Sequence, residues 1–220
     1  MATTTGPDVV SEGLVLKLDS NNLKSYPGNG TTWFDIANSN NGNINGASFS
    51  NNSFSFDGVN DYINCGNKNS LSFTNLLTAQ IWCSSINLSS YRSPLMKTSS
   101  TSWSNGFGFY QVSNTFAFYI NQWNGSQRAI VSKGAFPLTH WVAVYDGSNV
   151  KLYENGNLVS TGSAFSSNIS NSTANLDIGR GGGGSYYWGG NINEVSLYNI
   201  ALTSDQVKKN FNSLRINFGI

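Results

Sequence analysis

Short runs in which apolar and polar residues alternate recur along the whole chain, and each run is bounded by Gly, Asn, Asp or Ser. A period of two residues is that of a β-strand with one buried face, and the bounding residue types favour turns. About a dozen such strands joined by regular turns predict an all-β, two-sheet antiparallel sandwich or jelly roll. The runs expected as strands are 14–18, 53–56, 61–65, 79–86, 106–110, 115–120, 128–131, 140–145, 150–153, 158–159, 176–178 and 192–198.

Turn chemistry and composition both favour strands over helices. Asn155-Gly156 separates two of the runs, and Asn-Gly is a strong hairpin signal because both central residues of a type I′ turn need a positive φ. The chain holds 32 Asn and 33 Ser among its 220 residues. Both side chains compete for backbone hydrogen bonds and weaken helices, so a mostly helical fold is excluded.

One helix is expected near the C-terminus, over residues 203–212. Thr203 and, three residues later, Gln206 form a capping box, in which each side chain bonds the other residue's backbone N–H. We expect the helix to pack on the sandwich through an apolar face. The apolar residues that follow the cap at helical spacing are Val207, Phe211 and Leu214.

Charge and hydropathy exclude two classes of partner. Lys and Arg number only 12 and are scattered, so the sequence has no basic patch for nucleic acid. It also has no run of about 18 apolar residues for membrane insertion. The N-terminus lacks the basic start and apolar stretch of a standard signal peptide, so we expect synthesis in a cytoplasm without classical export. The length suits an N-terminal arm over 1–12 and one domain over 13–220.

The two cysteines, Cys65 and Cys83, are too few for a disulfide framework. Cys83 lies in an alternating run with Ala79 and Ile81 on the same strand face, which favours a buried free thiol. A bridge between Cys65 and Cys83 is the alternative.

Four motifs together resemble those of laminin G-like domains in the concanavalin A-like lectin/glucanase superfamily. Residues 139–159 resemble the family's central hairpin, residues 56–62 its Phe-Asp-Gly-x-x-Asp-Tyr segment, and stretches within 178–199 its closing strand. Residues 201–205 are similar to the start of its terminal helix. The resemblance covers residues 13 to 212 in order. It implies a concanavalin A-like jelly roll of two curved antiparallel sheets with one short C-terminal helix.

The opening of this region, residues 13–19 and 24–35, is similar to openings common in tailed-bacteriophage structural proteins of the family. This resemblance implies a virion protein displayed on the head or tail, where it decorates or stabilises the particle or adheres to the host surface. Its expected partners are other virion proteins, host-surface glycans and, as a candidate, further copies of the chain. The alternative is a carbohydrate-binding lectin module that is not part of a virion.

Paired carboxylates, the catalytic groups of the superfamily's glucanases, are not evident in the sequence. A glycosidase of that kind needs two carboxyl groups about 5 to 9.5 Å apart. The three glutamates, Glu12, Glu154 and Glu194, lie far apart, and no Asp accompanies them on the same strand face. We therefore expect the chain not to be an enzyme.

Three other groups of residues receive structural interpretations. Asp57 and Asp61 bracket a turn, where we expect their carboxylates to bond backbone amides. The single histidine, His140, is expected as a structural residue at the start of a core strand, beside Trp141. Residues 179–184 are Gly-rich but lack the Lys-Ser/Thr of a phosphate-binding loop, so they are expected as a flexible loop.

A calcium site is a candidate that comes from the resemblance. In related glucanases, a carboxylate of the closing strand and groups of the N-terminal strand share one Ca²⁺, and Glu194 and Asp19 occupy comparable places here. Ca²⁺ prefers such oxygen ligands. The alternative is that Glu194 is simply hydrogen-bonded at the sheet rim.

Aromatic residues in Ser-, Asn- and Gly-rich loops are the candidates for sugar binding. Their faces can stack on the C–H groups of a pyranose, while nearby amides and backbone groups bond its hydroxyls. Residues 186–188 follow the glycine run, which predicts display on a mobile loop outside the core. The alternative is packing over the sheet edges or against a neighbouring subunit. The candidates are Trp103, Trp123, Tyr186, Tyr187 and Trp188.

Overall fold

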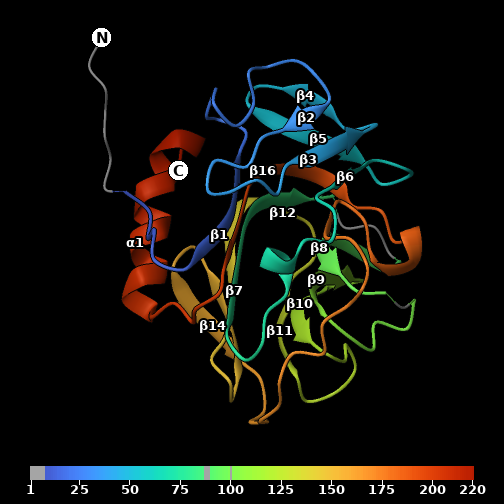
Figure 1. The fold of residues 1–220 in the computed structure, drawn as a ribbon, viewed down its shortest axis with the longest axis vertical. Helices are drawn as coiled ribbons and strands as arrows, with labels where there is room; N and C mark the ends of the chain where they lie inside the picture. Colours follow the sequence, from blue (N-terminus) through green and yellow to red (C-terminus); the bar gives the residue numbers. More distant parts are fainter. Residues whose placement is uncertain (1–7, 87–89, 100) are drawn as a thin grey trace.

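The computed structural model describes residues 8–86, 90–99 and 101–220, and its chain forms two antiparallel sheets of eight strands each. The first sheet has the order β14-β13-β12-β7-β16-β5-β4, and β1 also pairs with β16 (Figure 1). Its strands are β1 (Leu14–Asp19), β4 (Ser48–Ser50), β5 (Ser53–Asp57), β7 (Leu77–Ser85), β12 (Phe136–Tyr145), β13 (Val150–Glu154), β14 (Asn157–Thr161) and β16 (Gly189–Tyr198).

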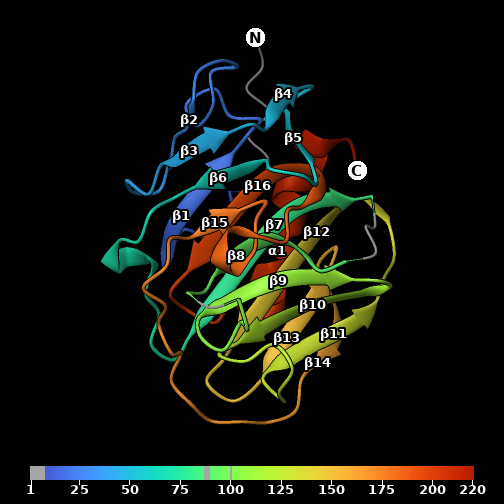
Figure 2. The ribbon, with the colours of Figure 1, turned by 90° about the vertical axis from the view of Figure 1, so that its right-hand side faces the viewer.

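The second sheet has the order β11-β10-β9-β8-β15-β6-β3-β2. Figure 2 looks onto this sheet, with β9 and β10 in front of β12 and β13. Its strands are β2 (Thr32–Trp33), β3 (Gly42–Asn45), β6 (Tyr62–Asn64), β8 (Arg92–Lys97), β9 (Phe107–Val112), β10 (Thr115–Ile120), β11 (Arg128–Ser132) and β15 (Asp177–Ile178). The predicted two-sheet antiparallel sandwich is confirmed.

The core lies between the sheets and follows from strand alternation. β7 turns Ile81 and Cys83 inward, and β10 turns Phe116 and Phe118 inward to meet them in one cluster. Full burial of one such side chain stabilises the fold by about 1.5 to 3 kcal/mol. Both cysteines are buried and free, so the buried-thiol prediction is confirmed and the bridge is not formed.

The Asn155-Gly156 turn between β13 and β14 has the predicted geometry. Asn155 has a φ of 49° and Gly156 a φ of 77°, the two positive values that a type I′ hairpin requires. A side chain at position 156 would also meet Lys208 of the C-terminal helix at 2.9 Å. The turn therefore fixes the hairpin and lets the helix approach it.

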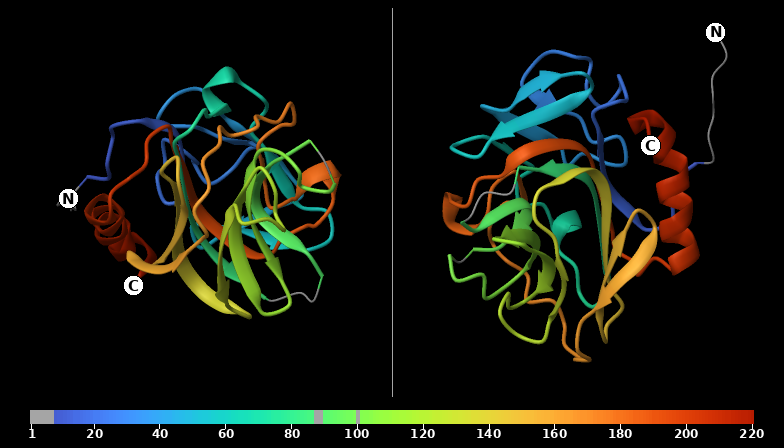
Figure 3. Two further views of the ribbon diagram at one scale, coloured as in Figure 1. Left: turned by 90° about the horizontal axis from the view of Figure 1, so that it is seen from below. Right: turned by 180° about the vertical axis from the view of Figure 1, so that it is seen from behind.

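Helix α1 (Ser204–Leu214) begins at the predicted cap and covers the outer face of the first sheet (Figure 3). The Thr203 hydroxyl accepts from the Gln206 amide at 3.2 Å, and the Thr203 amide donates to the Gln206 side chain at 2.8 Å. Val10, in the segment expected as an arm, is buried against this helix. The single-turn 3₁₀ helices are η1 (Asn69–Leu71), η2 (Gly182–Gly184) and η3 (Arg215–Phe218).

No helix in the described part of the chain has the length and apolar character needed to cross a bilayer.

Candidate functional site

An aromatic cluster lies on the outer face of the second sheet. Alternation along β9 and β10 sends phenylalanines into the core and sends Tyr110 and Tyr119 to the opposite face. Tyr119 lies opposite Gly108, where a side chain would meet Met96 at 2.9 Å, so the glycine lets Met96 pack on this face. The sheet thus supplies a rigid floor for residues that the surrounding loops contribute.

Four loop residues complete this aromatic cluster, which we define as Tyr91, Trp103, Tyr110, Tyr119, Trp123 and Tyr186. Trp103 is at its centre, with ring centroids 5.1 Å from Tyr186 and 5.5 Å from Tyr91. Trp103 is only 2% exposed and belongs to the floor. Tyr91, Trp123 and Tyr186 are half-buried and form the rim.

Hydrogen bonds hold the rim in place, and two residues of the cluster, one in the floor and one in the rim, have a strained backbone. The Arg128 guanidinium donates to the carbonyl of Trp123 at 2.9 Å, and the Ser93 amide donates to the carbonyl of Tyr186 at 3.0 Å. Trp103 and Tyr186 have φ values of 46° and 62°, a left-handed conformation that costs a non-glycine residue about 1 to 3 kcal/mol. Strained backbone conformations of this kind are frequent at binding sites, where they orient side chains and are maintained by the surrounding structure.

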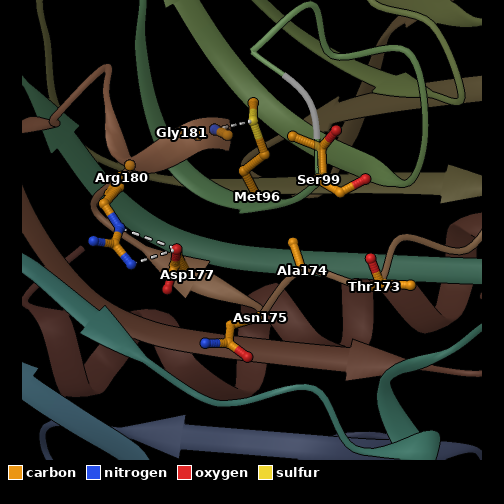
Figure 4. Close-up of a pocket in the computed structure, with 12 residues that line it drawn as sticks. Met96, Ser99, Thr173, Ala174, Asn175, Asp177, Arg180 and Gly181 are labelled. Carbon is orange, nitrogen blue, oxygen red and sulfur yellow. Dashed lines mark hydrogen bonds and ion pairs between the residues drawn. The ribbon is translucent and has the colours of Figure 1, made fainter.

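A cavity of about 350 Å³, shown in Figure 4, lies between the glycine loop 181–184, the end of β8 and residues 173–177. Met96 joins it to the aromatic cluster, since it lines the cavity and packs in the cluster. The Gly182 amide donates to the Met96 sulfur at 3.2 Å, which closes the glycine loop over this strand. The other lining residues are Thr98, Ser99, Thr173, Ala174, Asn175, Asp177, Arg180, Gly181, Gly183 and Gly184.

The charged groups of the cavity wall are paired with each other. Arg180 Nε and Nη2 both contact Asp177 Oδ2, at 3.0 and 2.9 Å, and Asn64 donates to Asp177 Oδ1 at 2.7 Å. The Arg180 guanidinium also lies 3.6 Å from the centre of the Tyr62 ring. Burial raises the pKa of the Asp177 carboxyl, and the charge of Arg180 opposes that rise. What the cavity offers a ligand is therefore mainly hydroxyl, amide and backbone groups.

Three of the five predicted aromatic candidates, Trp103, Trp123 and Tyr186, come together in the cluster. Tyr187 is half-buried beside Arg180, outside the cluster. The prediction for Trp188 is wrong, because this residue is fully buried in the core and its indole N–H donates to the Ser84 carbonyl at 3.1 Å. It enters the space between the sheets directly before β16.

Tyr91, Tyr110 and Tyr119 were not among the predicted candidates. Tyr110 and Tyr119 sit at the outward positions of strands whose inward positions are already phenylalanine, so both faces of β9 and β10 are aromatic. A two-sided aromatic strand pair is a signal that the sequence contains. Tyr91 carries no such signal, since it belongs to no strand.

The residues of the predicted calcium site lie together, and the Glu194 carboxylate is already hydrogen-bonded to protein donors. Asp19 and Glu194 are direct partners in the β1–β16 ladder. The Gln80 amide donates to both Glu194 oxygens at 3.1 Å, and Ser196 also donates to this carboxylate. Ca²⁺ takes about six to eight oxygen ligands, and the described residues contain no group of three His, Cys, Asp or Glu placed to hold a metal. Glu194 is hydrogen-bonded, as the alternative states, but fully buried rather than at the rim.

The remaining candidates have structural roles. His140 is fully buried between Trp82 and Phe211, with ring centroids at 4.9 and 5.8 Å, and desolvation lowers its pKa to about 3. Asp61 accepts a hydrogen bond from the Asp57 amide at 3.0 Å, which closes the predicted turn.

The family model Laminin_G_3, described as the concanavalin A-like lectin/glucanases superfamily, matches residues 57–208, about two thirds of the chain. No curated protein matches the sequence.

Solved structures with this fold include sialidases and a toxin domain. A Trypanosoma rangeli sialidase mutant displaying trans-sialidase activity has 17% identity and a TM-score of 0.68, over 95% of this chain and 34% of that one. The same sialidase in complex with sialic acid has 16% identity and a TM-score of 0.68, over 98% and 36%. The binding domain of botulinum neurotoxin DC in complex with SialylT has 13% identity and a TM-score of 0.63, over 93% and 52%. This chain thus spans about a third of the sialidases and about half of the toxin domain.

These comparisons correct the expectation that the chain is not an enzyme. Sialidase structures, among them one with trans-sialidase activity, share its fold over nearly its whole length. That expectation rests on one catalytic arrangement, two paired carboxylates, which the sequence lacks. Because a different set of groups can serve hydrolysis or transfer, the absence of that pair does not exclude catalysis, and the expectation is withdrawn.

Proposed function

The chain belongs to the concanavalin A-like lectin/glucanase superfamily, and on that basis we propose that it binds carbohydrate at the aromatic cluster and the adjoining cavity. The observation that carries the proposal is the juxtaposition of the half-buried aromatic rim with a cavity lined by hydroxyl, amide and glycine backbone groups. Binding sites commonly combine apolar surface with a few polar groups that fix orientation.

The two parts of the site suit the two faces of a sugar. A pyranose ring has apolar C–H groups, which stack on the rings of Trp123 and Tyr186, and hydroxyls, which the side chains of Ser99 and Asn175 can bond. The backbone of residues 181–184 comes close to the ligand because its glycines carry no side chains. Neighbouring structures support a glycan as the ligand class, since one holds sialic acid and another SialylT.

A glycan array followed by calorimetric titration of the strongest ligand tests this proposal. Tyr186→Ala and Trp123→Ala should each weaken binding by about tenfold or more, the loss that corresponds to about 1.4 kcal/mol. Phe34→Ala is the matched control, because it removes an aromatic side chain that is 43% exposed and belongs to neither the cluster nor the cavity. Equal affinities in all four proteins would contradict the proposal.

A bacteriophage virion role is the second candidate, and it rests on the likeness of residues 13–35 to openings of tailed-phage structural proteins. The same region exposes two apolar side chains, with Leu23 78% and Phe34 43% exposed, and in this second candidate they contact another virion protein or a further copy of the chain. Mass spectrometry of purified phage particles tests this role. Absence of the protein from particles would contradict it.

A further inference from the structure

Lys97, the last residue of β8, has its ammonium group buried behind the cavity wall. Lys97 is only 1% exposed. Its Nζ donates to Asn67 Oδ1 at 2.6 Å and to the carbonyls of Ser172 and Ala174 at 2.8 Å each. None of the ion pairs between described residues includes Lys97. Its ammonium is thus stabilised by hydrogen bonds to uncharged acceptors.

The acceptors of Lys97 belong to the segment that forms one side of the cavity. Asn67 also donates from its Nδ2 to the carbonyl of Thr173 at 2.9 Å. Lys97 and Asn67 together therefore hold the carbonyls of three consecutive residues, 172, 173 and 174. Thr173 and Asn175 of this segment are exposed and line the cavity.

Stability alone gives no reason for a lysine here. Desolvation lowers the pKa of Lys97 to about 8. At neutral pH the charged ammonium therefore has a higher free energy in the folded protein than in the unfolded chain, which lowers the stability of the fold. An apolar side chain of similar length would not incur this cost. What the ammonium supplies, and an apolar side chain cannot, is three donors that converge on the wall.

We infer that Lys97 is a positioning residue of the cavity: together with Asn67 it holds the wall at residues 172–175, so that Thr173 and Asn175 face the ligand. Its effect on ligand affinity rests on the proposed carbohydrate binding. Its effect on the order of the wall does not, and the two are measured separately.

Hydrogen–deuterium exchange of the whole protein tests the inference without a ligand. In Lys97→Met, the two hydrogen-bonded amides of the wall, those of Ala174 and Leu176, should exchange about tenfold faster or more, while amides of β9 and β10 keep the exchange rates of the unmodified protein. Lys151→Met is the matched control, because this lysine pairs with Asp146 at the surface, 2.7 Å away. Unchanged exchange at Ala174 and Leu176, or equal acceleration throughout the protein, overturns the inference.

A pH series on the unmodified protein gives a readout that needs no variant. As the pH rises through about 8, Lys97 loses its proton and one donor, so the exchange rate at Ala174 and Leu176, divided by the intrinsic chemical rate at each pH, should rise. The other charged groups at the cavity, Asp177 and Arg180, are paired with each other. Lys97→Met should lack this rise, and a rise of the same size in both proteins refutes the assignment.

Glycan affinity then separates the two proposals. If the unmodified protein binds a glycan, Lys97→Met should weaken binding by about tenfold while Lys151→Met keeps it; equal affinity refutes the positioning role alone. If the unmodified protein binds no glycan, the proposed function fails, and the exchange results still decide whether Lys97 orders the wall.

Discussion

Glu194 should make the fold less stable as the pH rises toward neutrality. The carboxyl is fully buried on the outer face of the first sheet, and desolvation raises its pKa to about 7, against the opposing effects of Lys17, Ser196 and Gln80. Asn210 of α1 donates to Gln80 Oε1 at 3.0 Å, so the same network connects the carboxyl to the helix. The titratable groups near it are Lys17 and Asp19 of β1 and Tyr198 of its own strand, β16.

The size of the effect follows from the two pKa values. In the unfolded chain the carboxyl has a pKa of 4.5, so between that value and about 7 the folded protein holds a proton that the unfolded chain has released. The corresponding stability is fully present below the unfolded pKa and is lost as the pH rises through the folded one. The difference amounts to about 3 kcal/mol, or about 6 to 12 °C in melting temperature for a domain of this size.

Urea unfolding of the unmodified protein and of Glu194→Gln, at several pH values from about 4.5 to about 8.5, measures this term. The difference in unfolding free energy between the two proteins should shift in favour of the variant by about 3 kcal/mol across the range. Titration of other groups cancels in this difference. Glu154→Gln is the control, because Glu154 forms a surface ion pair with Lys133 at 2.6 Å and is not part of the buried network. Parallel pH curves for the unmodified protein and Glu194→Gln would refute the reasoning.

Three further predictions concern the core and the proposed site. In the folded protein the pKa of His140 is lowered from 6.5 to about 3, so its contribution to stability is fully present above pH 6.5. That contribution falls by about 5 kcal/mol between pH 6.5 and about 3, where the unfolded chain binds a proton and the folded protein does not. His140→Phe should therefore reduce the loss of unfolding free energy in acid, measured by urea titration, and an unchanged pH dependence contradicts this. Trp188→Ala should lower the unfolding free energy by about 3 to 5 kcal/mol in urea titrations, whereas a value near zero would place Trp188 outside the core. Glycan binding should persist in about 1 M salt, because apolar and neutral hydrogen-bonded contacts are not screened as charges are; calorimetry in low and high salt checks this, and loss of affinity would point to an electrostatic site.

Local signals in the sequence predicted most of the fold. Alternation located the strands, and the Asn155-Gly156 turn and the Thr203 cap depend only on residues adjacent in the chain. The sandwich class follows because strands with one apolar face must bury it against a second sheet. None of these features depends on which distant strands become neighbours.

The candidate site was only partly predictable, since it depends on such pairings. Tyr91, Trp103 and Tyr186 lie up to 95 residues apart in the sequence and meet only because β8, β9 and β15 are neighbours in the second sheet. For Trp188, by contrast, the local sequence signal itself led to the wrong prediction. Its glycine-rich surroundings predicted an exposed loop, but Trp188 is already at the entry to β16, where the side chain turns into the core.

A crystal structure of the protein with the strongest ligand from the glycan array tests the central claim most directly. We expect a sugar ring to stack on Trp123 or Tyr186, with its hydroxyls bonded to Ser99, Asn175 or the backbone of residues 181–184. A glycan bound elsewhere, for instance in the hollow of about 440 Å³ that includes Asn51 and Asn191 on the first sheet, with the aromatic cluster untouched, would contradict the account.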